Sequence, residues 1–221
     1  IMSVQAYDII GDIHGHADEL VKLLTHLGYK DSSGGYSHES RKVIFLGDFI
    51  DRGENRVQQK QVLTIVMDMI RHENALAVMG NHEFNALAYH TKHEGHFLRP
   101  HTTKNKKQHQ AFLNEFPDNS EEKSIVLDFF FSLPLWLEID GLRVVHACWD
   151  HDHIQTMGSL CPSHCLDRSA LIEASTKGTK AFKAIEVLLK GFECELPAGI
   201  SFHDKDGNPR TAVRVQWWKQ D

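Results

Sequence analysis

Short apolar runs alternate with segments of helical periodicity over the N-terminal third of the chain. The apolar run 7–10 precedes residues 17–27, in which Ala, Leu and Val recur at the spacing of one helical face. The pattern repeats with a strand at 42–46, a helix at 57–72 and a strand at 75–79. Strand, loop and helix in this order predict an α/β fold whose loops gather at the carboxyl ends of the strands.

The periodicity changes after residue 89. Residues 89–119 are polar and rich in Lys, Arg and His, and we interpret them as a basic insertion at about 90–119. This insertion either closes over an extended polyphosphate or forms a solvated surface loop. We expect a further loop around the cysteines and histidines of 148–165. The other expected elements are helices at 121–131, 167–177 and 179–190, a strand at 142–146, and a hairpin with its turn at 206–209.

The composition is typical of one globular domain, 1–221. The chain has 221 residues, of which 41% are hydrophobic and 24% charged, enough for one sizeable core. A net charge of -6 and a pI near 6.2 argue against broad binding to nucleic acid or to an anionic membrane. No apolar run approaches the roughly 20 residues that cross a bilayer, and no export signal is recognisable. We therefore expect a cytoplasmic protein with reduced cysteines.

Three loops that follow apolar strands share glycine and metal-ligating residues. They are Gly11-Asp12-Ile13-His14-Gly15, Gly47-Asp48-Phe49-Ile50-Asp51-Arg52-Gly53 and Gly80-Asn81-His82-Glu83. Glycine lets the backbone turn sharply and approach a ligand, while Asp, His and Asn suit Mn²⁺, Fe or Zn²⁺. Alternate residues of an extended segment point the same way, so Asp12 and His14 can hold one metal, and Asp48 can bridge two.

A fourth segment, Val144-Val145-His146-Ala147, adds a histidine at the end of another strand. The four segments together predict a two-metal site. Two cations about 3.5–4 Å apart can hold phosphate oxygens and lower the pKa of a bridging water, giving hydroxide for in-line attack. His82 is then placed to protonate the leaving oxygen, with Asp51 to orient it. Arg52 offers a planar fork for the phosphate.

The ordered set GDIHG, GDFIDRG, GNHE and VHA resembles the signature of the calcineurin-like metallophosphoesterases. The GNHEFNAL and HACW segments resemble the bacterial diadenosine-tetraphosphatase-like branch more than the eukaryotic protein phosphatases. The resemblance implies a four-layer α-β-β-α sandwich with metals at the strand ends. It implies a first metal on Asp12, His14 and Asp48, a second on Asp48, Asn81 and His146, and substrate handling by Asp51, Arg52 and His82.

The sequence departs from this signature at its end. The family pattern closes with a further Gly-His pair that completes the second metal site, and no Gly-His follows His146. His203 is the nearest late candidate. We therefore expect a weak second metal site and a chain that is shortened at its C-terminus.

The favoured function is hydrolysis of a dinucleoside polyphosphate, or a related small phosphate ester, through a metal-bound hydroxide. We expect two divalent ions, with Mn²⁺ favoured, and substrate contacts from Arg52, Asn81 and Arg99. One alternative is a protein serine/threonine phosphatase, and another is a catalytically weak phosphate-binding module. Trp149, Trp217 and Trp218 are candidates to stack on a nucleobase, although core packing is the favoured role for one of the last two.

Overall fold

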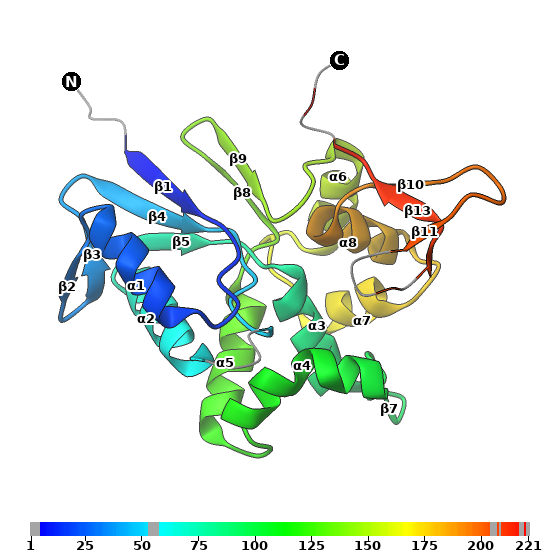
Figure 1. Ribbon diagram of the computed structural model, residues 1–221, viewed down its shortest axis with the longest axis horizontal. Helices are drawn as coiled ribbons and strands as arrows, with labels where there is room; N and C mark the ends of the chain where they lie inside the picture. The colour runs from blue at the N-terminus through cyan, green and yellow to red at the C-terminus, as the bar shows by residue number, and fades with distance from the viewer. Residues whose placement is uncertain (1–4, 53–57, 204–206, 208, 217–218, 220–221) are drawn as a thin grey trace.

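A parallel three-stranded sheet lies at the centre of the N-terminal half (Figure 1). Its strands are β1 (Ala6–Ile10), β4 (Arg41–Phe45) and β5 (Ala75–Ala77), in the order β1-β4-β5. Ile9 pairs with Ile44, which in turn pairs with Leu76. The three predicted strands are therefore confirmed. The structure, a computed structural model, describes residues 5–52, 58–203, 207, 209–216 and 219.

Two amphipathic helices cover one face of this sheet. They are α1 (Ala17–His26) and α2 (Gln59–Arg71), which lie below the sheet in Figure 1. Their buried residues join Val43 and Phe45 of β4 in one apolar core. Both helices are confirmed within two residues of their expected ends, except that 53–57, where the expected start of α2 falls, lies outside the described residues.

A β-hairpin covers the other face of the sheet. Its strands are β8 (Trp136–Ile139) and β9 (Leu142–Val145), and Leu137 pairs with Val144 in their antiparallel register. These two side chains belong to the small apolar cluster that includes Ile44. On the far face of the hairpin, the Trp136 ring lies beside Gly158.

The far face of the hairpin meets a second helical layer. This layer holds α6 (His151–Leu160), α7 (Arg168–Ser175) and α8 (Lys180–Lys190), whose apolar residues share the main core with Trp136. The order of layers is helix, sheet, sheet, helix, which confirms the expected α-β-β-α sandwich. Within the described residues the second sheet consists of the β8–β9 hairpin.

Side-chain caps fix the starts of the helices in the C-terminal half. The Asp167 carboxylate accepts from the Ala170 N–H at 2.7 Å, and the Thr179 hydroxyl accepts from the Phe182 N–H at 3.0 Å. Gly191 ends α8 with a φ of 95°, which glycine adopts without a steric penalty. The helices expected here are confirmed, as is α5 (Glu121–Ser132).

Helices occupy two segments in which the sequence predicted none. The basic insertion begins at His90, the last residue of the preceding helix, and contains a short hairpin and the 13-residue helix α4 (Thr103–Glu115), which the Thr102 hydroxyl caps. The helical periodicity of this segment is hard to detect in the sequence because α4 has few apolar residues, with only His109 and Phe112 buried. The loop expected at 148–165 contains α6, capped by Asp150. Neighbouring elements are α3 (Asn81–His90), β6 (Lys92–His93) and β7 (His96–Phe97).

The remaining strands form three short antiparallel pairs. The antiparallel pairing expected on either side of the turn at 206–209 is confirmed, since β11 (Phe202–His203) pairs with β12 (Pro209–Arg210), while 204–206 and 208 lie outside the described residues. All four cysteines are free. Trp149 packs against the main core, whereas Trp217 and Trp218 lie outside the described residues. The pairs are β2 (Lys30–Ser32) with β3 (Gly35–Ser37), β10 (Glu193–Glu195) with β13 (Ala212–Arg214), and β11 (Phe202–His203) with β12 (Pro209–Arg210).

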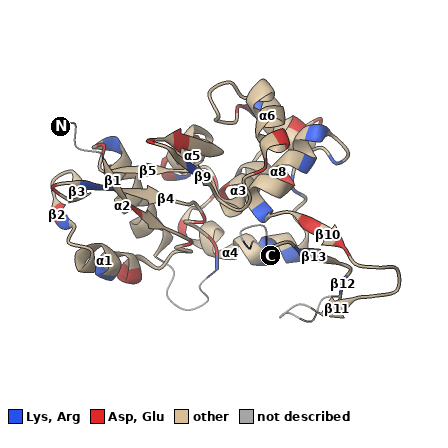
Figure 2. Cartoon of the chain, turned by 90° about the horizontal axis from the view of Figure 1, so that it is seen from above, with Lys and Arg blue, Asp and Glu red and all other residues tan. Residues whose placement is uncertain are grey.

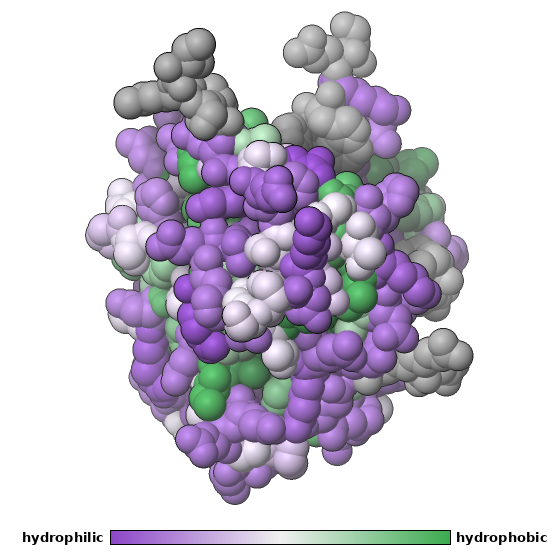
Figure 3. Space-filling view, turned by 90° about the vertical axis from the view of Figure 1, so that its left-hand side faces the viewer, coloured by the Kyte–Doolittle hydropathy of each residue, from purple (hydrophilic) through white to green (hydrophobic). Residues whose placement is uncertain are grey.

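Charges of both signs are interspersed over the surface. In Figure 2, Lys and Arg positions as well as Asp and Glu positions are scattered along the chain. The face seen in Figure 3 is mainly hydrophilic, and its apolar residues form small separate patches. Among the described helices, none has the length and apolar content needed to cross a membrane.

Candidate functional site

The loops that follow β1, β4 and β5 converge at one edge of the sheet and are joined by backbone hydrogen bonds. The N–H groups of Ile13 and His14 both donate to the Asp48 carbonyl, at 3.0 and 2.9 Å. The Gly15 N–H donates to the Phe49 carbonyl at 2.8 Å. The first two motif loops therefore hold each other in a fixed register, with the side chains of both facing the same space.

A buried glutamate joins the third loop to the second. Glu83 is fully buried, and its carboxylate accepts from the backbone N–H groups of Asp48 at 2.8 Å, Phe49 at 2.9 Å and Gly80 at 3.0 Å. Burial, followed by repulsion from Asp48, raises the pKa of Glu83, while the N–H donors oppose that rise. The sequence analysis gave Glu83 no role. An acid three residues after the Gly80 N-cap is the capping-box pattern, and this signal could have identified it.

Two glycines allow these loops to touch. Gly47 has a φ of 86°, and a Cβ at that position would lie 2.2 Å from the Gly80 nitrogen. A Cβ on Gly80 would lie 2.3 Å from Asp48 Oδ1. Since real Cβ atoms do not approach other atoms this closely, any other residue at either position would push the loops apart.

Four candidate site residues have backbone conformations that non-glycine residues seldom adopt. The φ angles are 47° at His14, 52° at Asp48, 63° at Asp51 and 61° at Arg52. Each such conformation costs on the order of 1–3 kcal/mol and persists only where the surroundings enforce it. The hydrogen bonds between the loops, together with Glu83, provide that enforcement.

Asp48 lies at the centre of the converging side chains. Its Oδ2 atom is 3.6 Å from His146 Nε2, 3.8 Å from His14 Nε2 and 4.0 Å from His82 Nε2. Its Oδ1 atom accepts from the His82 backbone N–H at 2.9 Å. Two sets of potential ligand atoms lie within 4.8 Å of one another, and Asp48 belongs to both: His14 with Asp48 and His82, and Asp12 with Asp48 and His146.

Backbone carbonyls orient two of these histidines. The Nδ1 atom of His14 lies 2.9 Å from the Ile50 carbonyl, and that of His146 lies 2.6 Å from the Leu46 carbonyl. A carbonyl only accepts, so both Nδ1 atoms carry a proton, and in the neutral rings both Nε2 atoms present a lone pair to the centre. His14 Nε2 is buried and has no hydrogen-bond partner. A buried, unpartnered lone pair beside carboxylates fits a metal cation, so these residues suit the metal that the motifs imply.

Asp12 and Asn81 are the remaining candidate ligands from the motif loops. Interaction with His14, together with the nearby His146 and Arg52, holds the pKa of Asp12 below its usual range, so this carboxylate is ionised near neutral pH. The Asn81 amide lies 3.2 Å from His146 Nε2. In one orientation of the amide, Asn81 Oδ1 faces His146 Nε2. Two ligand atoms of one cation would face each other in this way. In the other, its NH₂ group donates to His146 and to a backbone carbonyl.

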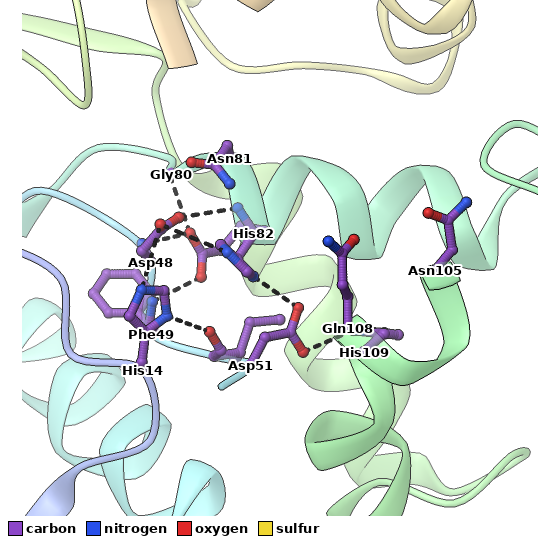
Figure 4. A network of polar contacts seen from close by, with 12 residues as sticks. His14, Asp48, Phe49, Asp51, Gly80, Asn81, His82, Asn105, Gln108 and His109 are labelled. Atoms are coloured by element: carbon purple, nitrogen blue, oxygen red, sulfur yellow. Dashed lines mark hydrogen bonds and ion pairs between the residues drawn. The ribbon is translucent and has the colours of Figure 1, made fainter. Parts of the chain in front are cut away.

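Asp51 links His82 to the inserted helix. Its two oxygens lie 2.9 Å from His82 Nδ1 and 2.9 Å from His109 Nδ1 (Figure 4). Burial acts to raise the pKa of Asp51, but the hydrogen bonds from His109 and His82 outweigh it and hold this pKa below its usual range. His109 was absent from the sequence-based candidates. Its spacing of three and seven residues from Phe112 and Phe116 marks a helical face and is the signal that could have found it.

An open cavity of about 390 Å³ leads to this centre. One side is formed by the motif residues, including Arg52 and Asn81, and the other by the end of α8 and β13, including Lys190 and Arg214. The structure thus brings together the predicted residues Asp12, His14, Asp48, Asp51, Arg52, Asn81, His82 and His146.

Two sequence candidates lie outside this cluster. Arg99 does not line the cavity, and its guanidinium donates to Asn105 Oδ1 at 3.2 Å and Gln108 Oε1 at 2.7 Å. Burial lowers the pKa of Arg99, a change that the Asp51 charge opposes. His203 is exposed on β11, and it does not line the cavity either.

The chain is similar in sequence to known proteins. The family model described as calcineurin-like phosphoesterase matches residues 7–174. A bis(5'-nucleosyl)-tetraphosphatase PrpE, asymmetrical, of Oceanobacillus iheyensis is 31% identical over 144 residues, covering 63% of this chain and 54% of that protein. The protein of the same name from Geobacillus sp. is 46% identical over 76 residues, covering 34% of this chain and 30% of that protein.

A cold-active protein-tyrosine phosphatase of a Shewanella species aligns with 87% of this chain and 57% of its own, at 20% identity and a TM-score of 0.48. The chain spans about half the length of the first of these curated relatives and about a third of the second. The family model covers all three motif loops and the His146 segment. The chain therefore belongs to the calcineurin-like phosphoesterase family.

Proposed function

We propose that this chain is a metal-dependent hydrolase of phosphate esters or anhydrides, with dinucleoside polyphosphates or related small phosphate esters as its substrates. The observation that carries the proposal is the geometry at Asp48. Two histidines, His14 and His146, are each fixed by a backbone carbonyl so that the Nε2 lone pair faces Asp48 Oδ2. An arrangement of this kind has little use in a protein core, where a buried lone pair without a partner is costly.

Five residues would hold two divalent cations around Asp48. Asp12, His14 and Asp48 would bind the first, and Asp48, Asn81 and His146 the second. The mixed oxygen and nitrogen donors suit Mn²⁺, with Fe or Zn²⁺ also compatible. When bound, the ions would supply positive charge for the phosphate oxygens and would acidify water. We expect the second ion to bind more weakly, because its protein ligands include a neutral amide in place of a second carboxylate.

The chain's own residues would bind the phosphate and move a proton. Arg52 lines the cavity beside Asp12, so its planar guanidinium can bind two phosphate oxygens. His82 presents Nε2 toward the same centre, while its Nδ1 donates to the buried Asp51 carboxylate. Asp51 fixes the ring orientation, so that His82, when protonated, can donate the Nε2 proton to the leaving oxygen.

Two observations support a substrate with several phosphates. The proteins from Oceanobacillus and Geobacillus are named as bis(5'-nucleosyl)-tetraphosphatases. The cavity also carries Lys190 and Arg214 on the side opposite the motif loops, in addition to Arg52. Cations on both sides of one cavity suit a chain of phosphates better than a single phosphate on a bulky protein surface.

The test is turnover of three substrates side by side, with Mn²⁺ added: diadenosine tetraphosphate, a phosphoserine peptide and a chromogenic phosphate monoester. We expect the highest kcat/KM for diadenosine tetraphosphate. A preference for the peptide would instead assign the chain to the protein phosphatases. No turnover of any of the three, with phosphate still bound, would make it a binding module.

Metal content tests the ligand assignment separately. Asp48→Asn is expected to reduce the bound metal at both positions, because one carboxylate serves both ions, whereas Asp128→Asn on the exposed face of α5 leaves it unchanged. Titration of the metal-free protein is expected to show one tight and one weak equivalent. Loss of metal at one position only would place the bridge elsewhere.

A further inference from the structure

The inserted helix α4 reaches the proposed catalytic residues through a buried histidine. His109 is 4% exposed, and its Nδ1 lies 2.9 Å from Asp51 Oδ1, while the other oxygen of Asp51 is 2.9 Å from His82 Nδ1. In Figure 4 the Asp51 carboxylate lies between the two rings, one from the start of α3 and one from α4. Both carboxylate oxygens are therefore held by imidazole N–H groups.

The opposite edge of His109 is also held. Its Nε2 lies 3.1 Å from His90 Nε2, and its ring stacks on Phe112 with centroids 4.7 Å apart and 15° between the planes. Burial, followed by the charge of Lys123, lowers the pKa of His90 to about 3, so His90 is neutral at physiological pH. His109 Nδ1 donates its proton in a hydrogen bond to Asp51, so the other ring nitrogen, Nε2, accepts from the His90 Nε2–H. Both ring nitrogens of His109 are then hydrogen-bonded.

We propose that His109 is a positioning residue for the hydrolytic reaction: it fixes the Asp51 carboxylate so that Oδ2 remains directed at His82. This inference rests on the proposed function, in which His82 protonates the leaving oxygen. A carboxylate with one partner can rotate, and a buried oxygen without a donor is destabilising, so the second histidine removes both sources of misalignment. The basic insertion is thereby part of the active-site support through its buried face.

The first experiment removes the donor. His109→Phe keeps the stacking on Phe112 but leaves Asp51 Oδ1 without its N–H. We expect kcat for a substrate with a poor leaving group to fall about 10–100-fold, the usual effect of removing an orienting partner, with KM and metal content unchanged. For a good leaving group, which needs little protonation, the loss is expected to be under about threefold.

Two isosteric variants separate positioning from stability. His109→Asn places an amide N–H where Nδ1 was, whereas His109→Gln places it one bond farther along, so Asn is expected to restore most of kcat and Gln is not. His101→Phe is the matched control. This histidine of the same insertion stacks on Tyr89 at 3.8 Å and makes no contact with Asp51, so its replacement should leave kcat unchanged.

The His82→Asn background decides whether His109 acts through His82. In that background, His109→Phe is expected to cause no further loss of kcat, because the group that it positions is already absent. Wild-type kcat in His109→Phe, equal kcat in the Asn and Gln variants, or additive losses in the double variant would each overturn the positioning role. If His82→Asn itself had wild-type kcat on poor leaving groups, the proposed function would fail first, and the two failures are therefore distinguishable.

Discussion

The two sides of the cavity are built in opposite ways. The motif side is buried and densely hydrogen-bonded, with Asp48, Asp51 and Glu83 each at most 3% exposed. The opposite side is formed by the end of α8 and by β13, where Arg214 is exposed and its guanidinium has no hydrogen bond to any residue the structure describes. The first side must hold strained backbone and buried charge, so it tolerates few substitutions. The second can change its proposed contacts to substrate without disturbing the proposed metal ligands.

The largest effect is expected from inserting a side chain where the motif loops touch. Gly80→Ala puts a Cβ 2.3 Å from Asp48 Oδ1, whereas Gly11→Ala, in the first motif loop, meets nothing within 4 Å. We expect Gly80→Ala to lose about 3 kcal/mol of unfolding free energy, the upper part of the range for overpacked sites, and most of its metal. Denaturant unfolding and metal analysis measure both. Equal stability of the two variants would show that the motif side is less rigid than we argue.

The second-largest effect is expected from removing the proposed proton donor, His82, while the motif loops remain folded. His82→Asn is expected to lower kcat about 10²–10⁴-fold for poor leaving groups, since this is the usual contribution of a general acid. Metal content should stay at the wild-type level. The measurement is kcat across a series of esters whose leaving-group pKa values differ. A loss that is the same for all members of the series would remove proton donation from the role of His82.

A smaller effect is expected on the opposite side. Arg214→Ala should raise KM for diadenosine tetraphosphate about fivefold, as the loss of ~1 kcal/mol for a solvent-exposed ion pair implies, with kcat and metal content unchanged. The rise for a phosphate monoester should be smaller. Arg210→Ala, on the neighbouring strand β12 and paired with Glu193 at 3.4 Å, is the control. If Arg214→Ala lowered kcat and left KM unchanged, the two sides would not divide chemistry and binding as proposed.

The smallest effect is expected from the exposed face of α4. Replacing Lys104, Lys106 and Lys107 with Gln should weaken tetraphosphate binding about twofold at low salt, because these side chains act only through long-range charge. The effect should vanish near 1 M salt, where screening shortens the Debye length to about 3 Å. Equilibrium binding at two salt concentrations measures it. A large, salt-independent loss would place these lysines in direct contact with substrate.

The strand-end loops could be predicted because their signals are local. An apolar strand such as 42–46 followed directly by Gly47 and Asp48 fixes both the strand and the place where it ends. The same segments carry the metal-ligating residue types, so the fold and the centre of the site follow from one pattern. Sequence also identified the helices with strong caps, such as the one that follows Asp167.

The supporting residues could not be predicted because their roles depend on tertiary placement. Glu83 acts through backbone N–H groups that are 34 and 35 residues away in the sequence, and His109 meets Asp51 across 58 residues. Charge alone suggested Arg99 as a substrate contact, but it could not show that the guanidinium donates to Asn105 and Gln108 of α4. The positions of Lys190 and Arg214 on the cavity likewise depend on how α8 and β13 pack.

The separation of the ligands along the chain has a consequence for folding. His146 bonds to the Leu46 carbonyl across 100 residues and faces Asn81 across 65, in a chain whose cysteines are all free. Cations shared by these segments would act as reversible crosslinks that close long loops, a restraint that the unfolded chain lacks. A ligand at 100 times its Kd adds about 2.7 kcal/mol to the free energy of unfolding. The free metal concentration would then determine both the stability of the folded chain against unfolding and its rate of turnover.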